Sequence, residues 1–147
     1  MRKIFIIVKG MSYEDRTAFL IDALKAHKNV IDIKDIMSGD NYDTLQRILK
    51  KDISEQLKFA LVDEMFNMLF DENPNCRTVI TTVNDARLIK IAELYYDCQA
   101  SLVIMNDDDL KDCDDMINNI VKSFDITDHN LVYGEDYEKI AADLLAA

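Results

Sequence analysis

The chain has few cysteines and histidines. Its 147 residues include three cysteines (Cys76, Cys98 and Cys113), which show no paired spacing, and two histidines. A structural zinc site draws four ligands from these residue types at short, regular spacings. We therefore expect reduced thiols, no metal and no disulfide framework, as is usual for a cytoplasmic protein.

Long apolar runs are also absent. No stretch approaches the roughly 20 residues that a membrane span requires. The first apolar run, residues 4–8, is shorter than the core of a signal peptide, and no small-residue cleavage site follows it. The sequence predicts a cytoplasmic protein with no membrane partner.

Positive charge is scarce. The chain has 17 Lys and Arg against 28 Asp and Glu, which gives a net charge of −11. A field of this sign repels nucleic acid, and the lysines of the first half are scattered along the chain. We therefore expect no direct nucleic-acid binding and a protein partner with a basic surface. The acidic residues are densest at Asp107, Asp108, Asp109, Asp112, Asp114 and Asp115.

What the chain does have is the composition and patterning of a folded domain, with 49% hydrophobic and 31% charged residues. Short apolar runs alternate with stretches of helical periodicity. Strands are expected at residues 4–8, 30–33, 77–83, 100–105 and 131–133. Helices are expected at residues 14–26, 41–51, from 52–55 to the break at 71–75, 84–96, 107–124 and 135–145. This order predicts a single α/β domain, residues 1–147, with a parallel sheet of four to five strands and helices on both faces.

Several local details can also be predicted. Residues 39–41 are expected to form a turn, and Asn84 is the expected cap of the helix that follows it, with Asp85 as the alternative. Helical spacing places Met65 and Met68 in the core, on a stripe that includes Leu57. Tyr95 belongs to the apolar stripe of its own helix, or serves with other tyrosines as an interface anchor.

Ligands of open parallel sheets bind beyond the carboxyl ends of the strands. Four segments follow strands here: residues 9–17, 34–35, 82–85 and 106–109. The first resembles a phosphate-binding loop, G-x-x-x-x-G-K-[ST]. Gly10, the cation position at Arg16 and the hydroxyl position at Thr17 are filled, whereas Asp15 stands where the second glycine belongs.

Together the four segments resemble the P-loop kinases of the polynucleotide-kinase and zeta-toxin-like branch, over about residues 1–119. The resemblance implies a P-loop kinase-like fold in which Gly10, Arg16 and Thr17 hold the phosphates of ATP–Mg²⁺. It also implies that Asp35, after the second strand, is the general base for an accepting hydroxyl. Asn84 matches the family's motif after strand three.

Three phosphate-handling elements depart from the family's pattern. Asp15 adds a negative charge beside the phosphates, and two unit charges about 4 Å apart repel by roughly 4 kcal/mol at an effective dielectric near 20. Thr82 replaces an acidic residue that would help to hold magnesium. Residues 106–124, where the family has a lid helix with arginines, contain no arginine.

These observations leave three hypotheses. The first is a catalytically degenerate kinase-like protein, without a cofactor, that binds a macromolecular partner through Asp107, Asp108, Asp109 and Asp112, as an acidic inhibitor from a phage or mobile element would. The second is an ATP-dependent phosphotransferase that acts on a nucleoside or nucleic-acid 5′-hydroxyl. The third is a nucleotide-binding or homo-oligomeric domain without transfer.

Overall fold

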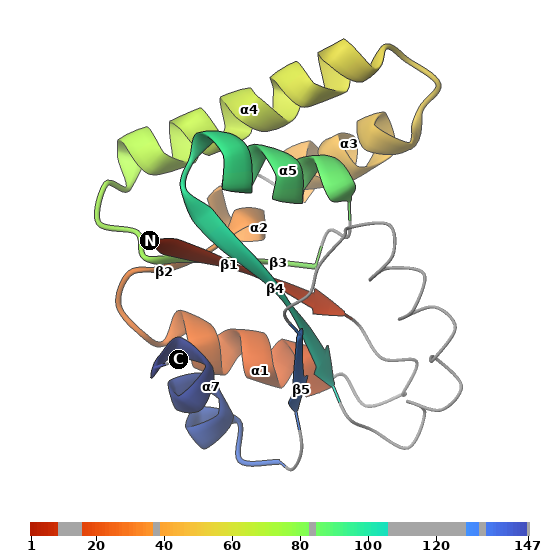
Figure 1. Cartoon of the computed structure of the whole chain (residues 1–147). Coiled ribbons are helices and arrows are strands. Elements are labelled where there is room, and N and C mark those ends of the chain that lie inside the picture. Colours follow the sequence, from red (N-terminus) through yellow and green to blue (C-terminus); the bar gives the residue numbers. More distant parts are fainter. Residues whose placement is uncertain (9–15, 37–38, 83–84, 106–128, 133–134, 147) are drawn as a thin grey trace.

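The chain builds one five-stranded sheet in the computed structural model, which describes residues 1–8, 16–36, 39–82, 85–105, 129–132 and 135–146 (Figure 1). The strands are β1 (Arg2–Val8), β2 (Val30–Asp32), β3 (Thr78–Thr81), β4 (Cys98–Met105) and β5 (His129–Val132). Their order across the sheet is β2-β3-β1-β4-β5, and each neighbouring pair is parallel. The predicted α/β class and parallel sheet are confirmed.

β1 lies at the centre of the sheet, between β3 and β4. Successive side chains of a strand point to opposite faces. Ile4 and Ile6 accordingly belong to one buried cluster, and Phe5 and Ile7 belong to another. A strand that is buried on both faces needs apolar residues at every position, and this requirement explains the unbroken apolar run in the sequence.

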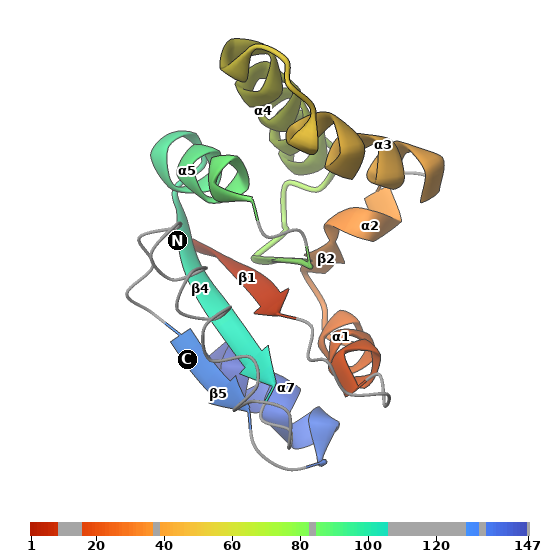
Figure 2. The ribbon, with the colours of Figure 1, turned by 90° about the vertical axis from the view of Figure 1, so that its right-hand side faces the viewer.

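Helices cover both faces, as predicted (Figure 2). One face carries α1 (Arg16–Lys25) and α7 (Tyr137–Ala146), which pack against each other. The other carries α2 (Ile33–Ile36), α3 (Gly39–Lys50), α4 (Glu55–Glu72) and α5 (Ala86–Tyr95). In the part of the chain that the structure describes, no helix combines the length and the apolar character needed to cross a membrane.

The buried face of α4 differs from the predicted stripe. Met65 is buried as expected, but Leu57 and Met68 are 51% and 41% exposed, and the helix instead buries Phe66 and Phe70. Aromatic side chains remove the largest apolar area from water. The orientation of α4 about its own axis that buries Phe66 and Phe70 is therefore more stable than the orientation that would bury Leu57 and Met68. Likewise Tyr95, predicted to continue the stripe of its helix, is 72% exposed.

Helix boundaries supply two further corrections and decide between two predicted caps. α3 begins at Gly39, so the turn predicted at residues 39–41 is wrong. The N-cap of α5 is Asp85, whose side chain accepts a hydrogen bond from the Arg87 backbone N–H, so of the two predicted caps the alternative, Asp85, is confirmed. β2 ends at Asp32, so Lys34 and Asp35 lie inside α2 and not at the strand's end.

Candidate functional site

A cavity of about 240 Å³ opens at the carboxyl edge of the sheet. The chain leaves β1 toward α1 on one face, whereas it leaves the neighbouring β3 toward α5 on the other. Such a divergence marks the crevice in which open α/β sheets bind ligands. The cavity is lined by one side of α1, by the segment that ends β2 and begins α2, and by Thr82 after β3.

The first turn of α1 contributes Thr17, which lines the cavity and is only 4% exposed. Its neighbour Arg16 is partly exposed, and its Nη2 lies 3.6 Å from Oε1 of Glu135, just before α7. The structure therefore brings Thr17 into the cavity and places Arg16 in an ion pair. Gly10 lies outside the described residues.

Asp32 is the buried carboxylate of this site, at 7% exposure. Its Oδ1 accepts a hydrogen bond of 3.0 Å from the Lys34 backbone N–H, which satisfies a free amide in the first turn of α2. Burial raises the pKa of Asp32, and the charge of Asp35 adds to the rise, against the hydrogen bond from Lys34 and the charges of Lys25 and Lys34. A carboxylate with a raised pKa that faces a cavity is a suitable proton acceptor.

Sequence reasoning missed Asp32 and chose Asp35. Asp35 does line the cavity, but its Oδ2 lies 2.5 Å from Nζ of Lys25 on α1, and its side chain is 49% exposed. The hydrogen bond that Lys25 donates to Asp35 raises the pKa of Lys25. The available signal was an acidic residue inside the short apolar strand expected at residues 30–33.

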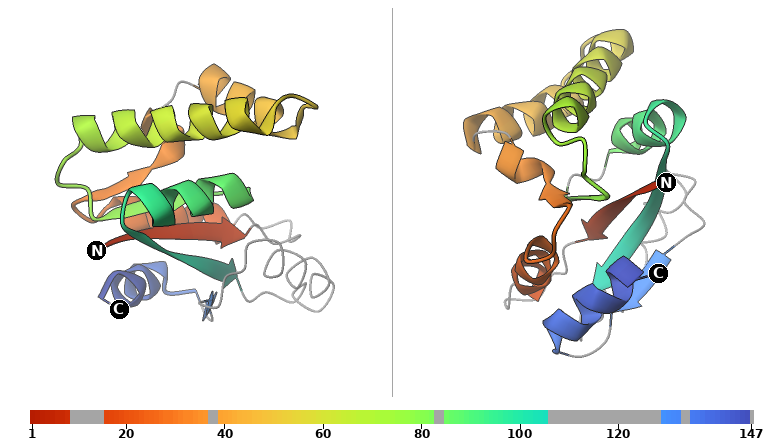
Figure 3. Two further views of the ribbon diagram at one scale, coloured as in Figure 1. Left: turned by 45° about the horizontal axis from the view of Figure 1, so that its top comes forward. Right: turned by 90° about the vertical axis from the view of Figure 1, so that its left-hand side faces the viewer.

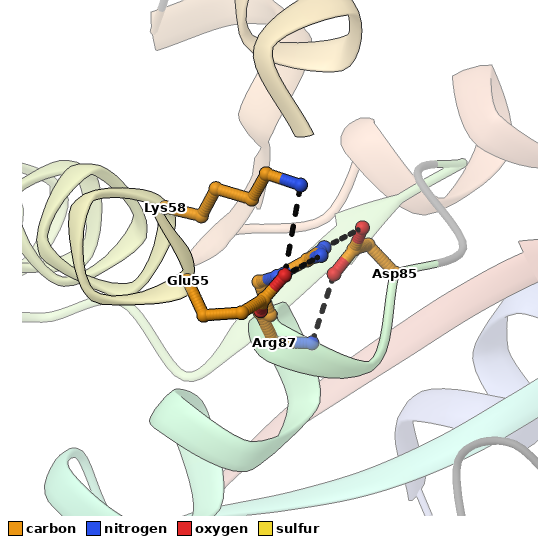
Figure 4. A network of polar contacts seen from close by, with 4 residues as sticks. All are labelled: Glu55, Lys58, Asp85 and Arg87. Atoms are coloured by element: carbon orange, nitrogen blue, oxygen red, sulfur yellow. Dashed lines mark hydrogen bonds and ion pairs between the residues drawn. The ribbon is translucent and has the colours of Figure 1, made fainter. Parts of the chain in front are cut away.

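Figure 4 shows a second polar cluster, formed by Glu55, Lys58, Asp85 and Arg87. It belongs to α4 and the start of α5, the helices of the other face of the sheet. The Nε and Nη2 atoms of Arg87 donate to the two carboxylate oxygens of Glu55, over 2.8 and 3.0 Å. Nη1 of Arg87 donates to Asp85, and Nζ of Lys58 lies 3.6 Å from Glu55. This cluster joins the first turn of α4 to the first turn of α5.

Charge pairing in this cluster is strong. The hydrogen bonds from Arg87 lower the pKa of Glu55 to about 2, and the same bonds raise the pKa of Arg87. Lys58 is only 6% exposed, so its cation is held within the protein beside Glu55. A carboxylate bound through two parallel hydrogen bonds is fixed in position as well as in charge.

The electrostatic character of the carboxyl edge follows from these pairs. Arg16, Lys25, Lys58 and Arg87 each lie within ion-pair distance of a carboxylate. Phosphate binding depends on cations that can turn toward the ligand. Here carboxylates compete for those four cations, of which Lys25 lines the cavity, whereas the second lysine of the lining, Lys34, makes no ion pair with a described residue.

Metal binding receives no support from the described segments, in which no group of three or more His, Cys, Asp or Glu side chains is placed to hold an ion. The predicted partner-binding residues Asp107, Asp108, Asp109 and Asp112 lie outside those segments. Of the predicted site residues, the structure thus brings Thr17 and Asp35 together in one cavity and adds Asp32.

Comparison with protein-family models, with curated proteins and with solved structures finds no match to this chain.

Proposed function

We propose that the chain is a kinase-like α/β domain that transfers no phosphate and acts by binding a macromolecular partner with a basic surface. The observation that carries the proposal is the ion pairing of Arg16, Lys25 and Arg87 with carboxylates at the edge where a kinase would hold its nucleotide. The cavity lies at the edge where the resemblance would put a nucleotide. Of the two lysines that line it, Lys25 is paired with Asp35, whereas Lys34 makes no ion pair with a described residue.

Binding of ATP would have to break this pairing. A triphosphate has three to four negative charges, and each contact with Lys25 or Arg87 would expose Asp35 or Glu55 to the incoming phosphate. Repulsion between two unit charges about 4 Å apart is roughly 4 kcal/mol at an effective dielectric near 20. Asp15, which comes directly before Arg16 in the chain, adds a further negative charge.

Attraction of a basic partner follows from the net charge of −11. Complementary charge accelerates association and makes it sensitive to salt. The densest acidic stretch, residues 107–115, comes just after β4 in the chain. Rows of carboxylates resemble the phosphates of a nucleic acid in charge, so a nucleic-acid-binding surface on another protein is the partner we propose.

The kinase activity that the proposal excludes can be tested by thermal unfolding with ATP–Mg²⁺. A ligand present at ten times its Kd stabilises the native state by about 1.4 kcal/mol. We expect no shift in the midpoint at 5 mM ATP–Mg²⁺. A shift that disappears in Arg16→Ala would overturn the proposal.

The partner can be tested with two charge-matched triple variants. Asp107→Asn, Asp108→Asn and Asp109→Asn together should abolish a salt-sensitive pull-down and should leave the midpoint of unfolding unchanged. The control neutralises the exposed residues Glu64, Glu72 and Glu93, which removes the same net charge elsewhere. Equal loss of the partner in both variants would show that net charge alone is responsible and would reject residues 107–109 as the contact.

A second candidate function is favoured by one observation, the position of Asp32 and Thr17 in the same cavity. In this alternative, Asp32 accepts the proton of a nucleoside or nucleic-acid 5′-hydroxyl while Thr17 faces the donor. Transfer of radioactive phosphate that is abolished in Asp32→Asn would support it. An ATP-dependent shift without any transfer would instead indicate a nucleotide-binding domain.

A further inference from the structure

A second cavity, of about 310 Å³, lies at the amino edge of the sheet, away from the site described above. Its wall includes the start of β1, the loop between α4 and β3, and the turn between α5 and β4. The left-hand view of Figure 3 shows the start of β1 on the same side as the loop that leads from α4 into β3. Two arginines, Arg2 and Arg77, reach this cavity from different elements.

The guanidinium group of Arg2 is held in place by an aromatic ring and by a backbone carbonyl. Its guanidinium carbon lies 4.2 Å from the centre of the Phe70 ring, and its Nε donates a 3.1 Å hydrogen bond to the Cys76 carbonyl. Phe70 in turn packs on Phe66 and Tyr96, with ring centres 6.0 and 5.4 Å away. An arginine stacked on an aromatic ring loses little further freedom when it binds a ligand.

Arg77 is fixed only through its backbone. Its N–H donates 2.9 Å to the carbonyl of Asn29, whereas its exposed side chain makes no hydrogen bond or ion pair with a described residue. Asp97 lines the same cavity, and within the described segments its carboxylate lies beyond ion-pair distance of both guanidinium groups. This contrasts with the carboxyl edge, where the cations are paired.

We propose that this amino-edge cavity binds a small oxyanion, a phosphate or carboxylate group, between the guanidinium groups of Arg2 and Arg77. The planar fork of arginine matches both groups through two parallel hydrogen bonds. Two like charges that face one cavity repel each other, and a bound anion removes that repulsion. The volume lies at the lower end of the range for small-molecule sites.

The net charge of −11 does not prevent such binding. At physiological salt the screening length is about 8 Å, so remote carboxylates contribute little at the cavity. Asp97 is the acidic residue that lines the cavity, so its carboxylate is the main source of repulsion toward an anion bound there. The proposal is independent of the proposed function, because the two sites lie at opposite edges of the sheet.

The experiment is a titration of ¹⁵N-labelled protein with sodium phosphate, and separately with sodium succinate, at constant ionic strength. We expect saturable shifts of the amide signals of residues 75–77 and 96–97. Saturation by phosphate alone assigns a phosphate ligand, and saturation by both assigns the shared oxyanion chemistry. No saturable shift with either anion at 50 mM, or shifts confined to residues 16–35, would overturn the proposal.

Two variants decide whether the arginines carry the binding. Arg77→Ala should weaken phosphate binding by at least tenfold, because it removes hydrogen bonds to a charged group, and exposure of Arg77 makes a folding defect unexpected. The matched control, Arg47→Ala, removes another exposed arginine, from α3, and should leave the Kd unchanged. Equal weakening by the two variants would reject the site.

The variant Asp97→Asn should strengthen phosphate binding, whereas Arg77→Ala should weaken it. Asp97 has a positive φ of 53°, a conformation that asparagine also adopts readily, so the backbone should be preserved. Removal of this carboxylate should tighten phosphate binding about threefold, the effect of one unit charge about 6 Å away in water. Weaker phosphate binding in Asp97→Asn would contradict the placement of the anion in this cavity.

Discussion

Arg87 holds Glu55 through two parallel hydrogen bonds, Nε to Oε2 at 2.8 Å and Nη2 to Oε1 at 3.0 Å. The two residues are 32 positions apart in the chain, and their contact joins the first turns of α4 and α5 at the carboxyl edge of the sheet. The same guanidinium also contacts Asp85, the N-cap of α5. One arginine thus fixes the start of two helices.

The Glu55–Arg87 pair predicts a specific acid sensitivity. The pKa of Glu55 falls from its ordinary value of 4.5 to about 2 in the folded protein. Its contribution to stability is therefore fully present above pH 4.5 and is lost as the pH falls toward 2. Glu55→Gln should unfold at a lower urea concentration at pH 7 and should show a shallower loss of stability between pH 4.5 and 2.

Urea unfolding at pH intervals of 0.5 measures this difference. The control is Glu64→Gln, an exposed carboxylate on the same helix with no ion pair to a described residue. If the two variants lose stability along the same curve as the unmodified chain, the pair contributes nothing measurable.

Asp32 predicts the opposite dependence on pH. Burial raises its pKa above 3.8, so the folded state binds the proton more tightly than the unfolded state does. Stability from this group therefore falls as the pH rises from about 4 through the raised pKa. Asp32→Asn keeps a good cap for α2 and removes the buried charge. The variant should be at least as stable as the unmodified chain at pH 7, and its advantage should vanish below pH 4.

Thermal unfolding at pH 3.5 and pH 7 compares the two proteins directly. A lower midpoint for Asp32→Asn at pH 7 would show that the charged carboxylate stabilises the fold, through Lys25 or Lys34, more than burial destabilises it.

The layout of the sheet could be predicted from the sequence, whereas the details of the site could not. The unbroken apolar run of β1 and the alternation of strands with helices depend on local pattern, and those patterns predicted a parallel sheet correctly. The sequence did not single out Asp32, because doing so depends on where β2 ends. That boundary is set by the packing of Ile33, which is fully buried as the first residue of α2.

The ion pairs of the carboxyl edge were also beyond prediction from the sequence. Glu55 and Arg87 lie in different helices, and each looks like a solvent-exposed residue of its own helix. Only the tertiary arrangement of α4 beside α5 brings them together. Contacts of this kind depend on the whole fold, so periodicity and spacing contain no signal for them.

The phenol of Tyr96 should ionise at a higher pH than the phenols of ordinary tyrosines. Its hydroxyl donates to Asp63, with Oδ1 at 2.8 Å and the backbone carbonyl at 3.0 Å. Burial and this neighbouring carboxylate raise the pKa of Tyr96 to about 12. Stability from this group should fall as the pH rises from 10 to 12, because the unfolded chain releases the proton first.

Ultraviolet absorbance at alkaline pH detects this phenol as a late step in the tyrosine titration. Tyr96→Phe should lack that step and should cost about 1 kcal/mol at pH 7, the usual net value of one hydrogen bond. If the late step persists in Tyr96→Phe and an ordinary step near pH 10 is lost instead, the Tyr96 hydroxyl is not held by Asp63.

The rotation of α4 can be tested with two of its own residues. Phe66 is fully buried between Phe70 and Tyr96, with ring centres 6.0 and 5.6 Å away, whereas Met68 is 41% exposed. Phe66→Ala leaves a cavity in the core and should cost about 3–5 kcal/mol. Met68→Ala removes a side chain of comparable length from the solvent side and should change stability by no more than about 0.5 kcal/mol. Chemical unfolding of both variants distinguishes the observed face from the stripe predicted by spacing, because that stripe would make Met68→Ala the costlier change.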